Sequence, residues 1–234
     1  MSNIGIHQPN FLPWQGYFRK IALCDYFVFL DNVLMPLGKS YISRNLIKMH
    51  YQKQWATVPL NKHQIPIFEV EIANNDWISK LSRSLKVAYG NTAYFSLLNE
   101  IIIPEFEKKY NYIADLNISL IIKISMWLGI SKVKFIRASE MKLKKTDASS
   151  IIDILDRLKA TNYVTGFGLG TKRYLKDLDL ESKNISIKFI SNDFLAYKQI
   201  YGSFLKNLSI IDSCVNLGPS QAYKIINTNA IIKN

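Results

Sequence analysis

The first thirty residues carry the clearest pattern of apolar and polar positions in the chain. A short apolar run at 5–6 stops at the polar sequence HQPN of 7–10, where Pro9 has no amide proton to donate to a sheet. Apolar residues then recur at helical spacing over 17–22, and a continuous apolar run follows at 26–30. Strand, short helix and fully apolar strand together predict a βαβ unit of a parallel sheet.

A right-handed crossover places the ends of these two strands, at His7 and Asp31, on the same edge of the sheet. Open α/β sheets bind ligands at that edge, so we expect both side chains to face one cleft. His7 is the candidate general base, titrating near the ordinary histidine pKa of ~6.5. Asp31 is the carboxylate that orients the imidazole, binds a ribose hydroxyl or holds a metal. The alternatives are a histidine that bonds a loop carbonyl and an aspartate that caps a turn.

The remaining pattern predicts one α/β domain over 1–234, a largely parallel sheet flanked by helices, with a helical insertion at roughly 77–130. The segment 34–51 is expected to be loop-rich. Further strands are expected at 54–59, 67–72, 132–136, 163–165 and 186–190. Further helices are expected at 77–89, 93–110, 113–128, 148–158 and 221–232.

The composition removes several classes of protein. A hydrophobic fraction of 48% excludes intrinsic disorder, and 2 Cys in 234 residues exclude a disulfide scaffold. The longest apolar stretch, 118–130, contains Lys123 and is shorter than the ~20 residues that span a bilayer. The N-terminus has neither the basic start nor the apolar run of a signal peptide. We therefore expect a cytoplasmic protein without stable membrane insertion.

The net charge of +12 favours acidic partners such as nucleic acid, anionic lipid headgroups or phosphorylated small molecules. A composition rich in Ile, Asn and Lys, with lysines that only solvate the surface, explains the charge equally well. The basic residues are scattered and no nucleic-acid-binding module is recognisable, so no nucleic-acid partner is expected.

Two further segments offer groups for anion binding. Arg44-Asn45 pairs the usual fork for carboxylate or phosphate with a hydrogen-bonding neighbour. The glycines of 166–170 follow a predicted strand, and Lys172 and Arg173 come next, so amides and cations could cradle a phosphate. A flexible strand-to-helix turn is the alternative for this segment. No His/Cys cluster has metal-ligand spacing, and we expect no metal.

The chain resembles the WbqC-like family along nearly its whole length. The matching segments are HQPNFLPWQGYFRKI at 7–21, DYFVFLDNV at 25–33, Arg44-Asn45, Trp77 with Lys80, Ala93-Tyr94-Phe95, Leu128-Gly129, TGFGLGTKRYL at 165–175 and FLKNLSIIDSCVNLGP at 204–219. Two departures stand out. The segment before Arg44 lacks the expected aromatic residues, and Ser213-Cys214-Val215 replaces bulkier apolar residues.

The resemblance implies work on an activated sugar, because members occur in clusters that build O-antigen, the polysaccharide of lipopolysaccharide, or other surface polysaccharides. The first hypothesis is an acyltransferase that modifies an amino group of a nucleotide-linked sugar, with acyl-CoA as the donor. The second is an ATP-dependent ligase or nucleotidyl-transferring enzyme acting on a sugar precursor, although the second histidine of nucleotidylyltransferase-like folds is missing. The third is a non-enzymatic accessory protein of the same pathway.

Under the first hypothesis His7 and Asp31 are catalytic, the former as the base. The diphosphate would meet a cation, the base or sugar ring would stack on an aromatic side chain, and backbone amides or Asn45 would stabilise the oxyanion. The expected contact residues are Gln8, Asn10, Trp14, Tyr17, Arg44, Asn45, Gly168, Gly170, Lys172, Arg173 and Asn216. Asp212 and Asn216 share a helical face, so we expect them to pack toward the same cleft, with simple helix capping as the alternative.

Overall fold

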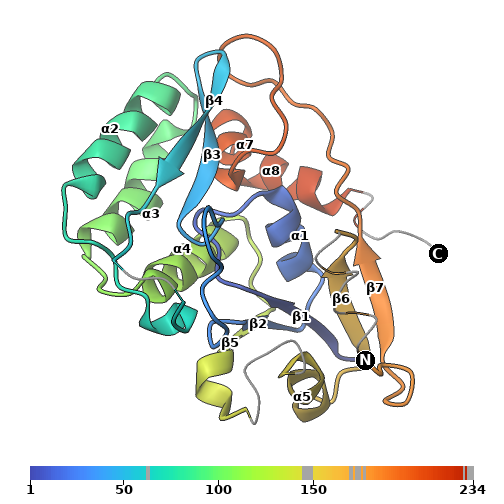
Figure 1. The fold of residues 1–234 in the computed structure, drawn as a ribbon. Coiled ribbons are helices and arrows are strands. Elements are labelled where there is room, and N and C mark those ends of the chain that lie inside the picture. Colours follow the sequence, from blue (N-terminus) through green and yellow to red (C-terminus); the bar gives the residue numbers. More distant parts are fainter. Residues whose placement is uncertain are drawn as a thin grey trace.

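The computed structural model describes residues 1–61, 64–143, 150–168, 171, 175, 178–228 and 230 (Figure 1). The chain opens with strand β1 (Asn3–His7), helix α1 (Gln15–Ala22) and strand β2 (Tyr26–Phe29). β1 and β2 pair in parallel, with His7 opposite Phe29. The βαβ unit predicted from the first thirty residues is therefore confirmed.

In the described part of the chain, five strands form one parallel sheet in the order β5-β2-β1-β6-β7. Its other members are β5 (Lys134–Arg137), β6 (Asn162–Gly166) and β7 (Ser186–Ile190). Counted along the chain, these strands have the order 3-2-1-4-5, which is that of doubly wound nucleotide-binding folds. The order reverses between β1 and β6, and ligands of such folds bind at this switch point. The expected α/β class with a largely parallel sheet is confirmed.

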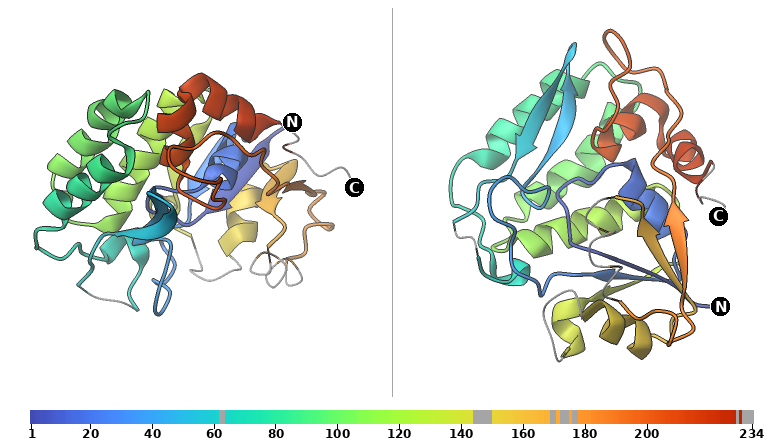
Figure 2. Two further views of the ribbon diagram at one scale, coloured as in Figure 1. Left: turned by 90° about the horizontal axis from the view of Figure 1, so that it is seen from above. Right: turned by 45° about the vertical axis from the view of Figure 1, so that its right-hand side comes forward.

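Helices cover both faces of the sheet. Successive residues of each strand point to opposite faces, so each strand contributes to two cores. Gly5, Phe27 and Phe29 face α1 and the larger hydrophobic core. Ile6 and Val28 face a second core under α5 (Ser150–Arg157). Figure 2 shows α5 on one side of the sheet and α1 on the other. The crossovers through α1 and α5 therefore run over opposite faces, which opens a crevice between the ends of β1 and β6.

Gly5 allows α1 to pack closely on β1. A Cβ atom added there would lie 2.6 Å from the Cys24 sulfur and 3.1 Å from the Phe27 ring. We expect Gly5→Ala to lower the free energy of unfolding by about 1–3 kcal/mol through overpacking. Urea denaturation measures this loss, and adding Cys24→Ala should restore most of it. Gly166→Ala, where the added Cβ meets nothing within 4 Å, is the control. Equal stability of all three variants would contradict the close packing.

In the described part of the sequence between β2 and β5, the chain forms an antiparallel hairpin, three α-helices and one short 3₁₀ helix (Figure 1). The hairpin is β3 (Arg44–Met49) and β4 (Gln52–Thr57), and the helices are α2 (Trp77–Tyr89), α3 (Phe95–Glu107) and α4 (Ile113–Trp127). The predicted helical region at 77–130 is confirmed. Two local predictions are wrong, since 44–49 is a strand and not a loop, and 67–69 is the 3₁₀ helix η1 (Ile67–Glu69) and not a strand.

Both errors have a physical cause. Asn45 and Lys48 are buried polar residues on β3, so the apolar alternation of a strand is not visible in the sequence. In η1 the amides of Ile67 and Phe68 donate to the carbonyl oxygens of Val33 and Asp31. The segment is therefore bonded to the loop that follows β2 and is not part of a sheet.

The C-terminal helices pack against α1 after an irregular segment at 191–209. These helices are α7 (Ile210–Leu217) and α8 (Pro219–Asn227). The buried Arg19 guanidinium of α1 joins these parts and lies over the Phe194 ring at 3.9 Å. It donates hydrogen bonds to the carbonyl oxygens of Ser191, Asp193, Ile225, Ile226 and Thr228. Elsewhere in the chain, the 3₁₀ helix η2 (Ala138–Met141) follows β5. Among the helices described, none has both the length and the apolar character required to cross a bilayer.

Candidate functional site

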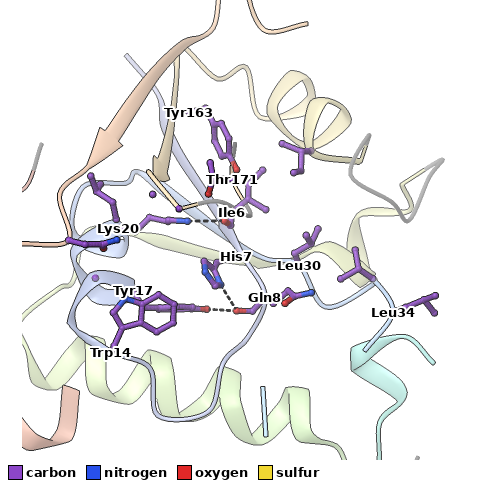
Figure 3. Close-up of a pocket in the computed structure, with 17 residues that line it drawn as sticks. Ile6, His7, Gln8, Trp14, Tyr17, Lys20, Leu30, Leu34, Tyr163 and Thr171 are labelled. Atoms are coloured by element: carbon purple, nitrogen blue, oxygen red, sulfur yellow. Dashed lines mark hydrogen bonds between the residues drawn. The ribbon is translucent and has the colours of Figure 1, made fainter. Parts of the chain in front are cut away.

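A pocket of about 700 Å³ lies at the C-terminal edge of the sheet, where the strand order reverses (Figure 3). The ends of β1, β6 and β7 and the first turns of α1 supply its walls. Its described lining residues are Ile6, His7, Gln8, Trp14, Gly16, Tyr17, Lys20, Leu30, Val33, Leu34, Ile151, Tyr163, Gly166, Gly168, Thr171, Ile190 and Asn192. The pocket therefore occupies the position at which doubly wound folds bind ligands.

His7 ends β1 inside this pocket, as the sequence predicts. Its Nδ1 lies 3.0 Å from the Gln8 carbonyl oxygen, so Nδ1 carries the proton and Nε2 keeps a free lone pair. The ring packs edge-on against Tyr17, with centroids 4.8 Å apart, and against Trp14 at 5.7 Å. Burial, and then repulsion from the Lys20 ammonium, lower the pKa of His7 to about 3. The imidazole is thus neutral throughout the physiological range, with Nε2 as its proton acceptor.

Lys20 is the charged residue of the described pocket lining, and the sequence analysis did not predict it. Its side chain is 5% exposed, and Nζ donates to the Ile6 carbonyl oxygen at 3.2 Å. Burial lowers the pKa of Lys20 to about 8, so the ammonium still prevails at neutral pH. The available signal was helical spacing, because Lys20 stands three residues after Tyr17 on the same face of α1.

The loop between β1 and α1 is held in place by amide side chains. Asn45 donates to the carbonyl oxygens of Phe11 at 3.3 Å and Leu12 at 2.8 Å, and Asn117 donates to that of Pro9 at 2.8 Å. The Tyr17 hydroxyl donates to the Gln8 carbonyl oxygen at 3.0 Å. These bonds fix a backbone that includes Leu12 at a φ of 41°. Asn45 therefore positions the loop and does not line the pocket.

Asn10 and Arg44 lie outside the pocket lining as well. Asn10 is buried in the loop core, at 4% exposure. The Arg44 guanidinium lies 4.0 Å from the centre of the Trp55 ring on the hairpin. Trp55 in turn contacts Tyr41, which contacts Trp14, with centroids 5.9 Å apart at each step. Aromatic rings thus connect the pocket with the half-exposed surface on which Arg44 stands.

Asp31 reaches the predicted sheet edge but faces β5 and not the pocket. Its fully buried carboxylate accepts three hydrogen bonds of 2.8 Å, from Arg137 Nε and from the amide and hydroxyl of Ser139. Arg137 also bonds Asp115 at 2.7 Å. The preceding residue, Leu30, lines the pocket in its place. The Asp31 carboxylate therefore links the end of β2 to β5 and to Ser139.

We expect Asp31→Asn to lower the free energy of unfolding by about 2–3 kcal/mol, because Arg137 and Ser139 lose a buried carboxylate. Turnover per folded molecule should stay within a few-fold of wild type. Urea denaturation and a rate normalised to folded protein measure both effects. Asp156→Asn, on an exposed carboxylate 3.4 Å from Lys183, is the control and should change stability by less than about 0.5 kcal/mol. Lost turnover at unchanged stability would show instead that Asp31 acts in the reaction.

The glycine segment after β6 contributes to the pocket through Gly166, Gly168 and Thr171. The expected contacts of Gly170, Lys172 and Arg173 lie outside the described residues. No three His, Cys, Asp or Glu side chains gather as a metal site within the described ranges.

The motif at 204–219 reaches the neighbourhood of the pocket through residues 204–208 and not through Asn216. Asn216 accepts from the Ile200 amide at 2.8 Å and donates to the Asp212 carbonyl oxygen at 2.7 Å. Its side chain does not line the pocket at the sheet edge. Asp212 accepts from Tyr197 and Gln199, so both residues hold the irregular segment. Residues 204–208 instead line a second pocket of about 320 Å³, which shares Trp14 and Asn192 with the first.

The fold and the site define a doubly wound α/β protein with a pocket at its switch point. The chain belongs to the WbqC-like protein family, whose model matches residues 8–224. It is similar to "Uncharacterized protein Rv1507c" of Mycobacterium tuberculosis (strain ATCC 25618 / H37Rv), at 29% identity over 224 residues. That match covers 93% of this chain and 95% of the relative. No solved structure gives a significant match. The family expected from the sequence motifs is thereby confirmed.

Proposed function

We propose that this protein is an enzyme of surface-polysaccharide biosynthesis that transfers an acyl group to an amino group of a nucleotide-linked sugar. The observation that carries the proposal is the neutral His7 imidazole, whose Nε2 is left as a proton acceptor inside a pocket at the switch point. The strand order 3-2-1-4-5 supports a nucleotide-linked substrate, because folds of this order bind nucleotides at that place.

The proposed reaction uses His7 as a proton acceptor. The amine nitrogen of the sugar attacks the carbonyl carbon of the acyl thioester, which forms a C–N bond and a tetrahedral oxyanion. The nitrogen of this intermediate is far more acidic than a free ammonium, so even a weakly basic Nε2 can accept its proton. Collapse of the intermediate breaks the C–S bond, and the thiolate leaves with the transferred proton. Gly166 and Gly168 line the pocket, and backbone amides of this kind can stabilise the oxyanion.

The pocket suits a substrate with both apolar and polar parts. Ile6, Leu30, Ile151 and Ile190 give apolar walls, and the Trp14 ring adds an aromatic surface for a sugar or a base. A volume of about 700 Å³ lies within the usual range of roughly 300–1,000 Å³ for small-molecule sites. The second pocket at 204–208 gives room for part of a second substrate, such as the acyl donor.

A thermal-shift screen against UDP-, dTDP- and GDP-linked sugars, acyl-CoAs and ATP tests the substrate classes. A ligand at 100 times its Kd adds about 2.7 kcal/mol of stability, which raises Tm by several degrees. We expect stabilisation by one class of nucleotide-linked sugar and by acyl-CoA. A protein that responds to neither would contradict the proposal.

The strand order also favours a second candidate, an ATP-dependent ligase or nucleotidyl-transferring enzyme. A histidine at the end of the first strand, beside the switch point, suits a nucleotide triphosphate as well as a nucleotide-linked sugar. In the same screen, stabilisation by ATP with no response to acyl-CoA would favour this candidate over acyl transfer.

A further inference from the structure

The Lys20 side chain brings a cation into the pocket, and the described residues that line the pocket supply no counter-charge. The side chain is 5% exposed, and Nζ has one hydrogen bond, to the Ile6 carbonyl oxygen, among the described contacts. An ammonium has three N–H donors, so two of them remain for a ligand. Figure 3 shows Nζ beside Ile6 on the pocket side of β1, close to His7.

The rest of the described lining offers no compensation for this charge. Its residues include no Asp or Glu, and its amides, hydroxyls and neutral imidazole carry no negative charge. A buried cation is costly unless it is paired, and proteins normally supply a carboxylate or the carbonyl oxygens that Arg19 has. Among the described lining residues Lys20 therefore has no partner of opposite charge, and a ligand with a negative charge would supply one.

We propose that Lys20 forms an anion subsite at the base of this pocket and binds a phosphate group of the nucleotide-linked substrate. The assignment to phosphate rests on the proposed function; the need for an anion does not. Gly166 and Gly168 line the same pocket, where the small residues let a phosphate approach the backbone. The subsite places the phosphate next to His7, because Nζ bonds the carbonyl of the residue that precedes it.

This placement connects binding with the basicity of His7. Repulsion from the Lys20 ammonium is the second cause of the low pKa of His7. A phosphate on Nζ offsets that repulsion, so the imidazole becomes a stronger base when the substrate is in place. Lys20 would then bind the substrate and adjust the proton acceptor through one charge.

Binding of nucleoside diphosphates to Lys20→Met tests the subsite directly. The probes are UDP, dTDP and GDP, with uridine, thymidine and guanosine as their uncharged counterparts, measured by isothermal titration calorimetry. We expect wild type to bind at least one diphosphate, and Lys20→Met to bind it about 10–100-fold more weakly, because one charge-assisted hydrogen bond is lost. The nucleoside should bind both proteins equally. Lys86→Met, which removes an exposed lysine of α2, should bind like wild type.

The pH dependence of wild-type binding is a second test that needs no variant. The titratable groups around Lys20 are His7, Tyr17, Cys24 and, across the pocket, Tyr163, with Asp25 and Lys188 beyond Cys24. His7 has a pKa of about 3 and Cys24 of about 12, so neither changes charge between pH 7 and 9. Lys20 loses its proton as the pH rises through about 8, while the diphosphate keeps its charge there. The affinity should therefore fall above pH 8.

Each outcome decides the subsite separately from the reaction. Equal diphosphate affinity in wild type and Lys20→Met, or an affinity that is constant from pH 7 to 9, would overturn the subsite. Wild type that binds none of the three diphosphates would overturn it as well. If Lys20→Met loses diphosphate binding but wild type transfers no acyl group, the subsite is supported and the proposed function is contradicted. We expect Lys20→Met to fold, because it removes a buried charge that has no partner of opposite sign in the described part of the chain.

Discussion

Replacing His7 by asparagine is expected to lower the rate of acyl transfer by about 10²–10⁴-fold, the usual contribution of a general base. Asparagine can still donate to the Gln8 carbonyl oxygen, so the loop keeps its hydrogen bond and the fold should lose less than about 1 kcal/mol. Substrate affinity should change little, since the base acts mainly in the transition state. Steady-state kinetics and urea denaturation of the two proteins measure these effects.

The lowered pKa of His7 sets the pH dependence that we expect of the wild-type enzyme. The sequence predicts an inflection of the rate near the ordinary histidine pKa of ~6.5. The structure changes that expectation, because a His7 pKa of about 3 leaves the free enzyme's base neutral from pH 5 upward. The kcat/KM of wild type should thus show no histidine inflection between pH 5 and 8. The same lowered pKa means that the unfolded chain binds a proton more readily, so wild-type stability falls as the pH drops from 6.5 toward 3. In His7→Asn, the free energy of unfolding should decrease less over this pH range, because the protonation of His7 no longer contributes.

His50→Asn is the matched control for this experiment. His50 is exposed in the hairpin turn with a φ of 53°, a conformation that asparagine adopts readily. Its rate should equal that of wild type. A His7→Asn protein that is folded and fully active would show that His7 is structural.

Replacing Arg19 by methionine is expected to lower the free energy of unfolding by about 3–5 kcal/mol. The variant strands buried carbonyl oxygens of the 191–193 segment and of the end of α8, and it removes the contact with Phe194. Domains of this size are stable by about 5–15 kcal/mol, so the loss is a large share of the total. Chemical denaturation, with thermal unfolding as a second readout, measures it.

Arg83→Met provides the comparison for Arg19. Arg83 is exposed on α2, and its removal should change stability by less than about 0.5 kcal/mol. Similar stability of the two variants would show that the carbonyl oxygens find other partners, and that Arg19 does not hold the C-terminal helices on α1.

The sequence predicted the sheet better than the site, for physical reasons. Strand β2 is apolar along its whole length and is preceded by Asp25, so it appears in the sequence as a distinct run. Strand β3 was missed because Lys48 is buried and donates to Gln199, a contact 151 residues away that leaves no local pattern. Arg19 was missed for the same reason, since its carbonyl partners lie at 191–228.

Within the site, position at a strand end was a good guide and residue type was not. His7 and Gln8 line the pocket because β1 ends there, and Trp14 and Tyr17 do so because α1 begins beside it. Asp31 and Asn45 have suitable chemistry, yet their side chains hydrogen-bond to Arg137 and to the loop backbone. Tertiary contacts decide whether a polar side chain is hydrogen-bonded within the protein or is available to a ligand.

Mass spectrometry of nucleotide-linked amino sugars after incubation with the protein and acyl-CoA tests the central claim most directly. UDP- and dTDP-linked amino sugars serve as acceptors, and the same sugars without the amino group are the control. We predict that at least one amino sugar gains the mass of the acyl group, that free CoA appears in equal amount, and that His7→Asn slows both by about 10²–10⁴-fold. No mass gain with any acyl-CoA, together with cleavage of ATP when it is added with the sugar, would contradict acyl transfer and point to the ligase.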